Sequence, residues 1–210
     1  MLFSDRFDAG RRLAAALAPY KGRKDAIILA IPRGALQIGK VLHERLGLPL
    51  DIIVTKKIPH PMSDEFAIGA VGPGGEYFVN PDAAPDILPE YIESQRRRLE
   101  AAVGEKYSRY RGGRPRPELK GKTIILVDDG IATGSTIIAA IHVLRKQAPA
   151  KIVVAVPVAP PDGLRRVAEQ ADEVVCLATP TDFMAIGQFY SDFTQVEDEE
   201  AIAILAECSG

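Results

Sequence analysis

The sequence predicts an α/β fold in which a parallel sheet is covered by helices on both faces. Several short apolar runs are rich in Ile and Val and lack the strict alternation of a half-exposed strand. Such runs are typical of strands buried on both faces. Segments with a helical spacing of apolar residues separate them, and regular alternation of strand and helix indicates a parallel sheet. The predicted strands cover residues 26–31, 50–55, 123–127, 152–158 and 173–177.

Three helices are predicted between these strands. Residues 35–46 place apolar side chains at a helical spacing, and Gly47 then ends the pattern. Residues 136–147 repeat this spacing. A shorter helix is expected over residues 164–171. These helices supply the cover that a parallel sheet needs on its two faces.

The middle of the chain departs from this rhythm. Two short candidate strands, 66–71 and 77–79, flank a glycine-rich turn and predict a hairpin. Residues 89–110 predict a long, charged helix, which the Gly- and Pro-rich segment after it cannot continue. We therefore expect one α/β domain over residues 1–210, with an insertion at about 59–117.

Composition excludes several classes of protein. The formal net charge is -2, which argues against nucleic acid as a partner of the whole chain. Cys176 and Cys208 lack the spacing of a metal site and do not suggest a disulfide framework. No apolar stretch is long enough to span a bilayer, and the N-terminus lacks the layout of a signal peptide. We therefore expect a cytoplasmic protein with no membrane partner.

Two carboxylates and a turn rich in Gly, Ser and Thr follow the predicted strand 123–127. Asp128 and Asp129 end this strand at the sheet edge where ligands of open α/β sheets bind. The turn then starts a helix, whose first N–H groups lack internal partners and attract anions. Paired carboxylates beside such a turn suit a sugar phosphate, because they accept hydrogen bonds from a diol or hold a divalent metal. The predicted phosphate-binding residues are Gly130, Ile131, Ala132, Thr133, Gly134, Ser135 and Thr136.

Other phosphate-binding loops fit this segment less well. A Walker loop requires a lysine where Ser135 stands, and the dinucleotide fingerprint G-x-G-x-x-G is absent here. The structural alternative is a plain helix cap that uses Ser and Asp. The ordered set of two acids and a hydroxyl-rich turn after a buried strand favours the binding site.

The segment VDDGIATGST, residues 127–136, resembles the motif with which type I phosphoribosyltransferases bind 5-phosphoribosyl 1-pyrophosphate (PRPP). The resemblance implies that Asp128 and Asp129 contact the ribose hydroxyls and that the turn after them binds the 5-phosphate. It implies a Rossmann-like parallel sheet with helices on both faces and a flexible-loop insertion. It also implies a small hood built by the chain ends, residues 1–24 and 182–210.

This resemblance extends to the expected reaction. Family members transfer the phosphoribosyl group of PRPP to a nitrogenous base and release pyrophosphate. For this chain we expect two substrates, PRPP and a small-molecule acceptor base of a purine-like kind. We expect Mg²⁺ as the cofactor. Dimerisation is common in the family, so a homodimer is also expected. Asp128, Asp129 and Arg33 are the predicted catalytic residues.

Basic residues after the first two strands resemble the pyrophosphate-binding part of the family's site. Arg33 and Gly34 follow the first core strand and resemble the pyrophosphate loop, where a guanidinium can chelate phosphate oxygens. Lys56 and Lys57 are expected at the end of the second strand, where several family members carry a basic pair. The structural alternatives are a plain strand-to-helix turn and a solvated strand end.

The hood and the insertion supply the remaining candidates. Phe183 and Ile186 resemble the part of purine salvage transferases that binds the base. Asp192 resembles a late acidic metal contact, so the predicted metal ligands are Asp128, Asp129 and Asp192. The insertion resembles a loop that closes over the site, and such loops deliver charged groups to it. Its candidate residues are His60, Glu65, Arg109 and Arg111.

Two departures from the family pattern leave the acceptor open. Hypoxanthine-type enzymes carry an acid, a candidate general base, where this chain has Ala132. They also place a lysine near the following strand, and residues 156–160 contain none. Two other functions remain open: a PRPP-sensing regulatory protein that uses the basic stretch 96–116, and a hydrolase acting on a phosphorylated sugar. A salt-dependent gel shift would identify the first, and consumption of PRPP without any base would identify the second.

Overall fold

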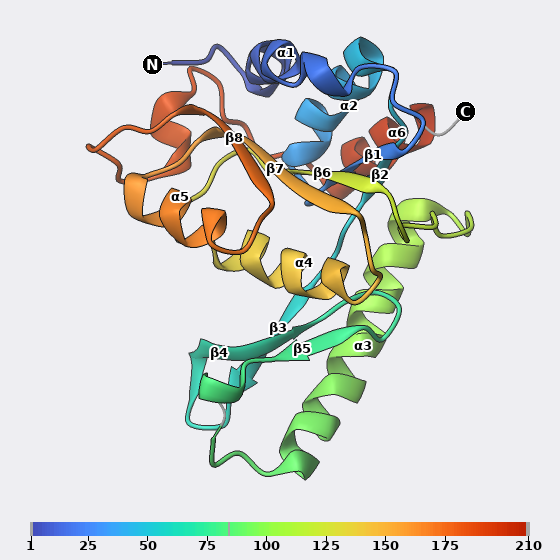
Figure 1. Cartoon of the computed structure of the whole chain (residues 1–210), viewed down its shortest axis with the longest axis vertical. Helices are drawn as coiled ribbons and strands as arrows, with labels where there is room; N and C mark the ends of the chain where they lie inside the picture. Colours follow the sequence, from blue (N-terminus) through green and yellow to red (C-terminus); the bar gives the residue numbers. More distant parts are fainter. Residues whose placement is uncertain (1, 84, 209–210) are drawn as a thin grey trace.

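The computed structural model describes residues 2–83 and 85–208, and its core is a five-stranded sheet (Figure 1). The strand order is β2-β1-β6-β7-β8, and every pairing is parallel. This confirms the predicted α/β fold. The strands are β1 (Ala26–Ala30), β2 (Leu50–Ile52), β6 (Thr123–Val127), β7 (Lys151–Val158) and β8 (Glu173–Ala178).

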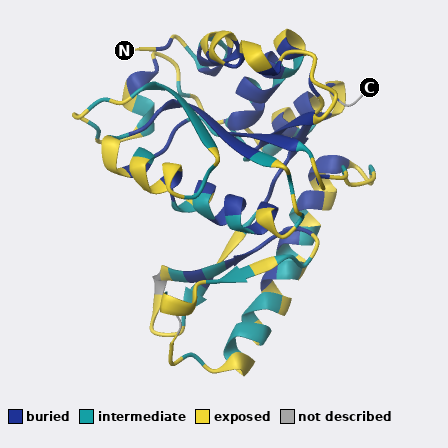
Figure 2. Cartoon of the chain, in the orientation of Figure 1, coloured by how far each residue is buried: buried dark blue, intermediate teal, exposed yellow. Residues whose placement is uncertain are grey.

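Helices cover both faces of this sheet because successive strand residues point to opposite sides. In β6, Ile125 and Val127 belong to one hydrophobic cluster, whereas Ile124 and Leu126 belong to the other. Figure 2 shows the resulting buried central layer. The first cluster includes residues of α1 (Arg6–Ala16), α2 (Ala35–Leu46) and α6 (Asp198–Glu207), and the second includes residues of α4 (Ser135–Arg145) and α5 (Pro161–Ala168).

The insertion forms an arm that projects from the core (Figure 1). It contains an antiparallel sheet of order β3-β4-β5 and one long helix, which share a small hydrophobic cluster around Ile58 and Leu99. The predicted hairpin and the predicted charged helix are both confirmed. The elements are β3 (Lys56–His60), β4 (Ser63–Val71), β5 (Tyr77–Val79) and α3 (Pro89–Arg111), and we call residues 56–111 the arm.

Two of the differences from the predicted element boundaries have identifiable reasons. The second core strand was expected over 50–55 but ends at Ile52, because its partner β1 ends at Ala30, opposite Ile52. Lys56 and Lys57 therefore do not end that strand; they begin β3 in the arm. Helix α5 begins earlier than expected, at Pro161, because proline has the backbone angle of a first helical turn and needs no donor there.

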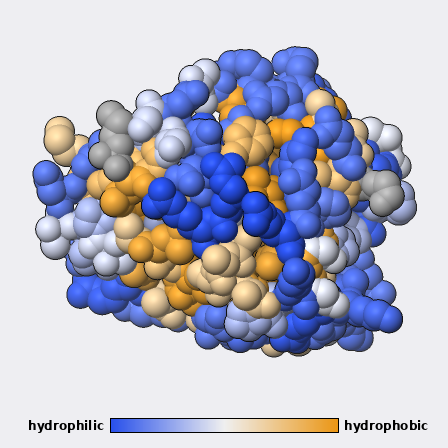
Figure 3. All heavy atoms as spheres, turned by 90° about the horizontal axis from the view of Figure 1, so that it is seen from above, coloured by the Kyte–Doolittle hydropathy of each residue, from blue (hydrophilic) through white to orange (hydrophobic). Residues whose placement is uncertain are grey.

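Segments from near the two ends of the chain meet beside the carboxyl edge of the core sheet, and we call residues 2–5 and 182–194 the hood. Phe3 pairs with Tyr190 in a parallel bridge, and the Phe3 N–H donates to the Phe189 carbonyl at 2.9 Å. Seen from above, the molecule presents strongly hydrophilic side chains next to hydrophobic ones (Figure 3). Within the described residues, no helix combines the length and apolar character needed to cross a bilayer.

Candidate functional site

Asp128 and Asp129, called the diacid below, lie directly after β6 at the carboxyl edge of the core sheet. The Asp129 N–H donates to Oδ1 of Asp128 at 2.9 Å, which orders the turn. The Tyr190 hydroxyl donates to the Asp129 carbonyl at 2.7 Å. A residue of the hood therefore fixes the backbone of the diacid in place.

Arg6, a residue that sequence reasoning missed, forms an ion pair with the diacid. Its Nε donates to Oδ2 of Asp129 at 2.8 Å, and the two side chains are only 7% and 15% exposed. Its Nη1 donates to the Thr194 carbonyl at 2.8 Å, and the guanidinium carbon lies 3.8 Å from the centre of the Phe193 ring. Arg6 thus joins helix α1, the diacid and the end of the hood.

The electrostatics of the diacid are those of two partly buried carboxylates beside one cation. Burial raises the pKa of Asp128 well above its ordinary value, and the adjacent charge of Asp129 raises it further. Burial also raises the pKa of Asp129, although the Arg6 guanidinium opposes that shift. Hydroxyl donors or a cation arriving at this edge would therefore relieve a repulsion that is already present.

The loop after β1, residues 31–34, packs against the same pair of charges. A Cβ atom placed on Gly34 would lie 2.3 Å from Oδ2 of Asp129 and 2.6 Å from Nε of Arg6, so only glycine fits here without movement. The peptide bond between Pro32 and Arg33 is cis. The loop predicted to bind pyrophosphate and the diacid are therefore in direct contact.

The side chain of Arg33 lies on a different side of this loop. Its Nη1 is 3.5 Å from Oε2 of Glu197 and 3.6 Å from Oδ1 of Asp198, at the start of α6. The Arg33 side chain is 32% exposed, and these separations are long for an ion pair. The Arg33 guanidinium therefore lies beside the acidic start of α6, whereas Gly34 touches the diacid.

The phosphate turn, residues 130–136, leads from the diacid into helix α4. Gly134 stands before the first helical residue with a φ of +82°, a value that a side chain at this position would disfavour. The hydroxyl oxygens of Thr133 and Ser135 are 2.9 Å apart, and Thr133 is exposed. Ile131 is buried and its N–H donates to the Val158 carbonyl at 2.8 Å. The turn therefore has a buried anchor, while Ala132, Thr133 and Thr136 are exposed at the start of the helix.

The arm approaches the end of the phosphate turn. A cavity of about 440 Å³ lies between β4, β5 and α4, and both Lys57 and Ser135 line it. Phe78 of β5 stacks on His142 of α4, with ring centres 3.9 Å apart. Lys57 is thus brought to the turn, whereas Lys56, also exposed, does not line this cavity.

The residues predicted to bind the base belong to the hood beside the diacid. A Cβ atom on Gly130 would lie 2.7 Å from Cγ2 of Ile186, so Ile186 packs directly on the phosphate turn. The Phe183 ring packs on Phe189, with centres 5.1 Å apart. Both side chains are partly exposed, so an apolar surface borders the turn that carries the diacid.

Asp192 takes part in a local turn. Its Oδ1 accepts hydrogen bonds from the N–H of Thr194 at 2.9 Å and from the Thr194 hydroxyl at 2.6 Å. In the part of the chain that the structure describes, no three Asp, Glu, His or Cys side chains are grouped to hold a metal ion. Asp192 therefore does not complete a set of three carboxylates with Asp128 and Asp129.

The candidates from the insertion have partners away from the diacid. Nη1 of Arg109 is 3.1 Å from Oδ2 of Asp198, and Arg111 forms a buried ion pair with Asp51. The His60 ring accepts from the N–H of Met62 at 3.1 Å. The side chain of Glu65 lies outside the described residues.

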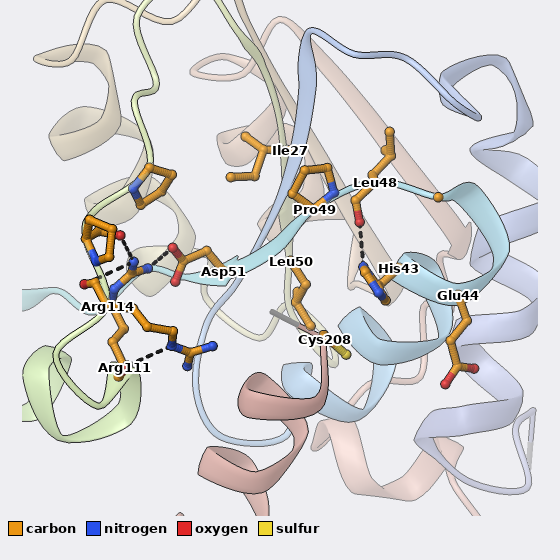
Figure 4. A pocket seen from close by; sticks show the side chains of 13 residues that line it. Ile27, His43, Glu44, Leu48, Pro49, Leu50, Asp51, Arg111, Arg114 and Cys208 are labelled. Carbon is orange, nitrogen blue, oxygen red and sulfur yellow. Dashed lines mark hydrogen bonds and ion pairs between the residues drawn. The ribbon is translucent and has the colours of Figure 1, made fainter. Parts of the chain in front are cut away.

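Arg111 lines a second cavity of about 800 Å³, shown in Figure 4. Asp51, Arg114 and Cys208 also line it, together with residues near the starts of β1 and β2. Because the core strands are parallel, their starts and ends lie at opposite edges of the sheet. This cavity therefore lies at the edge opposite the diacid.

The sequence matches the family described as "Phosphoribosyl transferase domain" over residues 4–194. Two Mycobacterium tuberculosis proteins, each named "Putative phosphoribosyl transferase", are 43% identical over 206 residues, which is 97% of this chain and 46% of theirs. The chain thus spans about half the length of these curated relatives. The crystal structure of the Thermus thermophilus protein TT1426 is 42% identical with a TM-score of 0.92, over 100% of both chains. The purine phosphoribosyltransferase of Pyrococcus horikoshii, 19% identical over 93% of this chain and 97% of its own, has a TM-score of 0.50 and shares the fold.

Proposed function

Because the chain belongs to the phosphoribosyl transferase domain family, we propose that it transfers the 5-phosphoribosyl group of PRPP to a nitrogenous base and releases pyrophosphate. One observation carries the proposal: the diacid, the phosphate turn and the glycine of the loop after β1 form one continuous surface at the carboxyl edge of the sheet. Gly34 touches Asp129, and Asp129 leads directly into the turn. Open α/β sheets bind ligands at this edge.

In the proposed reaction, the bond between C1 of the ribose and the pyrophosphate oxygen breaks, and a bond from C1 to the nitrogen of the base forms. Positive charge builds on the ribose ring as the pyrophosphate leaves. The diacid would accept hydrogen bonds from the ribose hydroxyls and stabilise that charge, and the phosphate turn would anchor the 5-phosphate. Lys57, which lines the same cavity as Ser135, would add positive charge near the 5-phosphate. The acceptor nitrogen also loses a proton, and no residue of this chain is assigned to remove it.

Mg²⁺ fits this site through the chemistry of the donors. It prefers hard oxygen ligands, and Asp128 and Asp129 supply two adjacent carboxyl groups at the carboxyl edge of the sheet. No third carboxylate, His or Cys joins them within the described residues. The remaining ligands would therefore come from PRPP and water. When bound, the metal would neutralise charge on the departing pyrophosphate.

The acceptor is proposed to be a planar, purine-like base held by the hood. Phe183 and Ile186 form a partly exposed apolar surface against the phosphate turn, and Ile186 packs on Gly130. Aromatic and aliphatic side chains of this kind suit the face of a base. This surface supports a flat acceptor.

Calorimetry with PRPP and Mg²⁺ tests the site. The wild type should bind PRPP, and the double variant Asp128→Asn/Asp129→Asn should bind it at least about tenfold more weakly, because charge-assisted hydrogen bonds to the ribose are lost. Asp162→Asn removes an exposed carboxylate of α5 and serves as the matched control. Equal PRPP affinity in the wild type and the double variant would refute the site assignment. A pyrophosphate-release screen over purines, pyrimidines and other nitrogenous acceptors then identifies the base.

A further inference from the structure

Arg6 is the most buried cation at the candidate site, and the proposed reaction gives it no role so far. Its side chain is 7% exposed, against 32% for Arg33. It reaches the diacid from helix α1, more than a hundred residues away along the chain. A charge is costly to bury unless it is paired, and the partner of Arg6 is a carboxylate that the proposed reaction assigns to the ribose hydroxyls.

The guanidinium lies against the loop that is predicted to bind pyrophosphate. A Cβ atom on Gly34 would be 2.6 Å from Nε of Arg6 and 3.1 Å from its guanidinium carbon. Arg6 therefore faces the backbone of this loop directly. The side chain of Arg33, although it belongs to the same loop, lies beside Glu197 and Asp198 instead.

The charge balance of the site also points to a role for Arg6. When Asp128 and Asp129 are ionised, their two negative charges exceed the single positive charge of Arg6. PRPP carries two separate groups of phosphate oxygens, and its pyrophosphate would enter beside these carboxylates. Arginine stays protonated and offers donors that match phosphate oxygens in pairs. A buried guanidinium on the pyrophosphate loop would offset the repulsion.

The contacts between the hood and Arg6 leave the guanidinium able to bind an incoming phosphate group. Phe193 covers one face of the guanidinium at 3.8 Å, and Nη1 donates to the Thr194 carbonyl at 2.8 Å. The ion pair with Asp129 rests on one hydrogen bond, which Nε donates. A single-bond pair gives way more readily to a competing ligand than a bidentate pair does.

From these contacts we infer that Arg6 binds the pyrophosphate group of PRPP. The inference rests on the proposed function and extends it. When the ribose hydroxyls occupy Asp129, the Arg6 guanidinium turns its donors across Gly34 to the pyrophosphate oxygens. There it stabilises the negative charge that grows on the leaving group. The ion pair with Asp129 is the resting state of the same guanidinium.

The test compares three ligands by calorimetry in the presence of Mg²⁺: inorganic pyrophosphate, PRPP and ribose 5-phosphate. Arg6→Met should weaken pyrophosphate and PRPP by about tenfold or more, the effect of losing a charge-assisted hydrogen bond, and should change ribose 5-phosphate by less than about twofold. Arg12→Met is the matched control, because Arg12 lies on the same helix, is 53% exposed and pairs with Asp8. It should leave all three affinities unchanged.

A second comparison covers the case in which Arg6→Met does not fold because Asp129 is left unpaired. Arg6→Met/Asp129→Asn removes both charges and is compared with Asp129→Asn alone. The double variant should bind pyrophosphate about tenfold more weakly than the single one.

The outcomes separate the inference from the proposed function. The inference about Arg6 is overturned if the Arg6 variants bind pyrophosphate as tightly as their reference proteins, or if they lose affinity equally for all three ligands. In either case the proposed function stands as long as the wild type binds PRPP. A wild type that binds no PRPP overturns the proposed function itself. Circular dichroism and thermal melting establish that each variant is folded.

Discussion

Replacing Gly34 by alanine should damage the candidate site because a single added atom meets two charged groups. The new Cβ would lie 2.3 Å from Oδ2 of Asp129 and 2.6 Å from Nε of Arg6. Real Cβ atoms essentially never approach closer than 3.0 Å, so the loop and the ion pair must separate by roughly 0.7 Å. Crowding of this kind costs about 1–3 kcal/mol, and displacements approaching 1 Å at a site can cost about a hundredfold in rate.

The assay for Gly34→Ala is calorimetry with PRPP and Mg²⁺, paired with thermal melting. If the crowding destabilises only the conformation that binds PRPP, by the full cost of about 1–3 kcal/mol, the Kd for PRPP should rise by about 5- to 150-fold. Gly104→Ala is the matched control: Gly104 lies in the middle of α3 with nothing within 4 Å of an added Cβ. That change should raise stability by about 0.5–1 kcal/mol and leave PRPP affinity intact. A Gly34→Ala protein that binds PRPP within twofold of the wild type would refute the reasoning.

Three further predictions concern stability. Burial raises the pKa of Asp128, so its carboxyl group holds a proton more tightly in the folded chain than in the unfolded chain, where aspartates titrate near about 3.9. The free energy of unfolding should therefore fall as the pH rises above about 4. Asp128→Asn should remove this part of the pH dependence and raise Tm at pH 7, and parallel pH curves for both proteins between pH 4 and 7 would contradict it. Gly130→Ala should cost about 1–3 kcal/mol because its Cβ would lie 2.7 Å from Ile186, and the double variant with Ile186→Ala should lose less than the sum of the single changes in urea unfolding. Asp51→Ala should cost about 3–5 kcal/mol because it leaves Arg111 buried and unpaired, and an unchanged urea midpoint would show that the ion pair contributes nothing.

The parts of the fold that are local in sequence could be predicted from it. Strand β6, the diacid, the phosphate turn and helix α4 follow one another within residues 123–145, so their order on the chain is also their order in space. The parallel sheet followed from the apolar runs, because strands buried on both faces lack alternation. The long helix of the arm could be predicted because a proline marks its start and two glycines follow its end in the sequence.

The contacts that complete the candidate site could not be predicted in this way. Arg6 and Asp129 are 123 residues apart, and nothing in the pattern of α1 connects them. The end of β2 depends on the length of its partner β1 rather than on its own residues, which is why residues 53–55 were assigned to the strand. Helix α6 was not predicted, and its first residue, Asp198, accepts a hydrogen bond at 2.5 Å from Tyr110, 88 residues away along the chain.

The pairing of Phe3 with Tyr190 has a consequence for the order of folding. It closes a loop that contains nearly the whole chain, and contacts of such long range generally form late because loop closure must precede them. On the ribosome, Asp129 would emerge well before Thr194, so the diacid would stay open until residues 189–194 have been made. Arg6, although made more than a hundred residues before Asp129, would reach its place only when Phe193 and Thr194 arrive. A chain arrested near residue 180 would then contain every core strand and still lack the closed site.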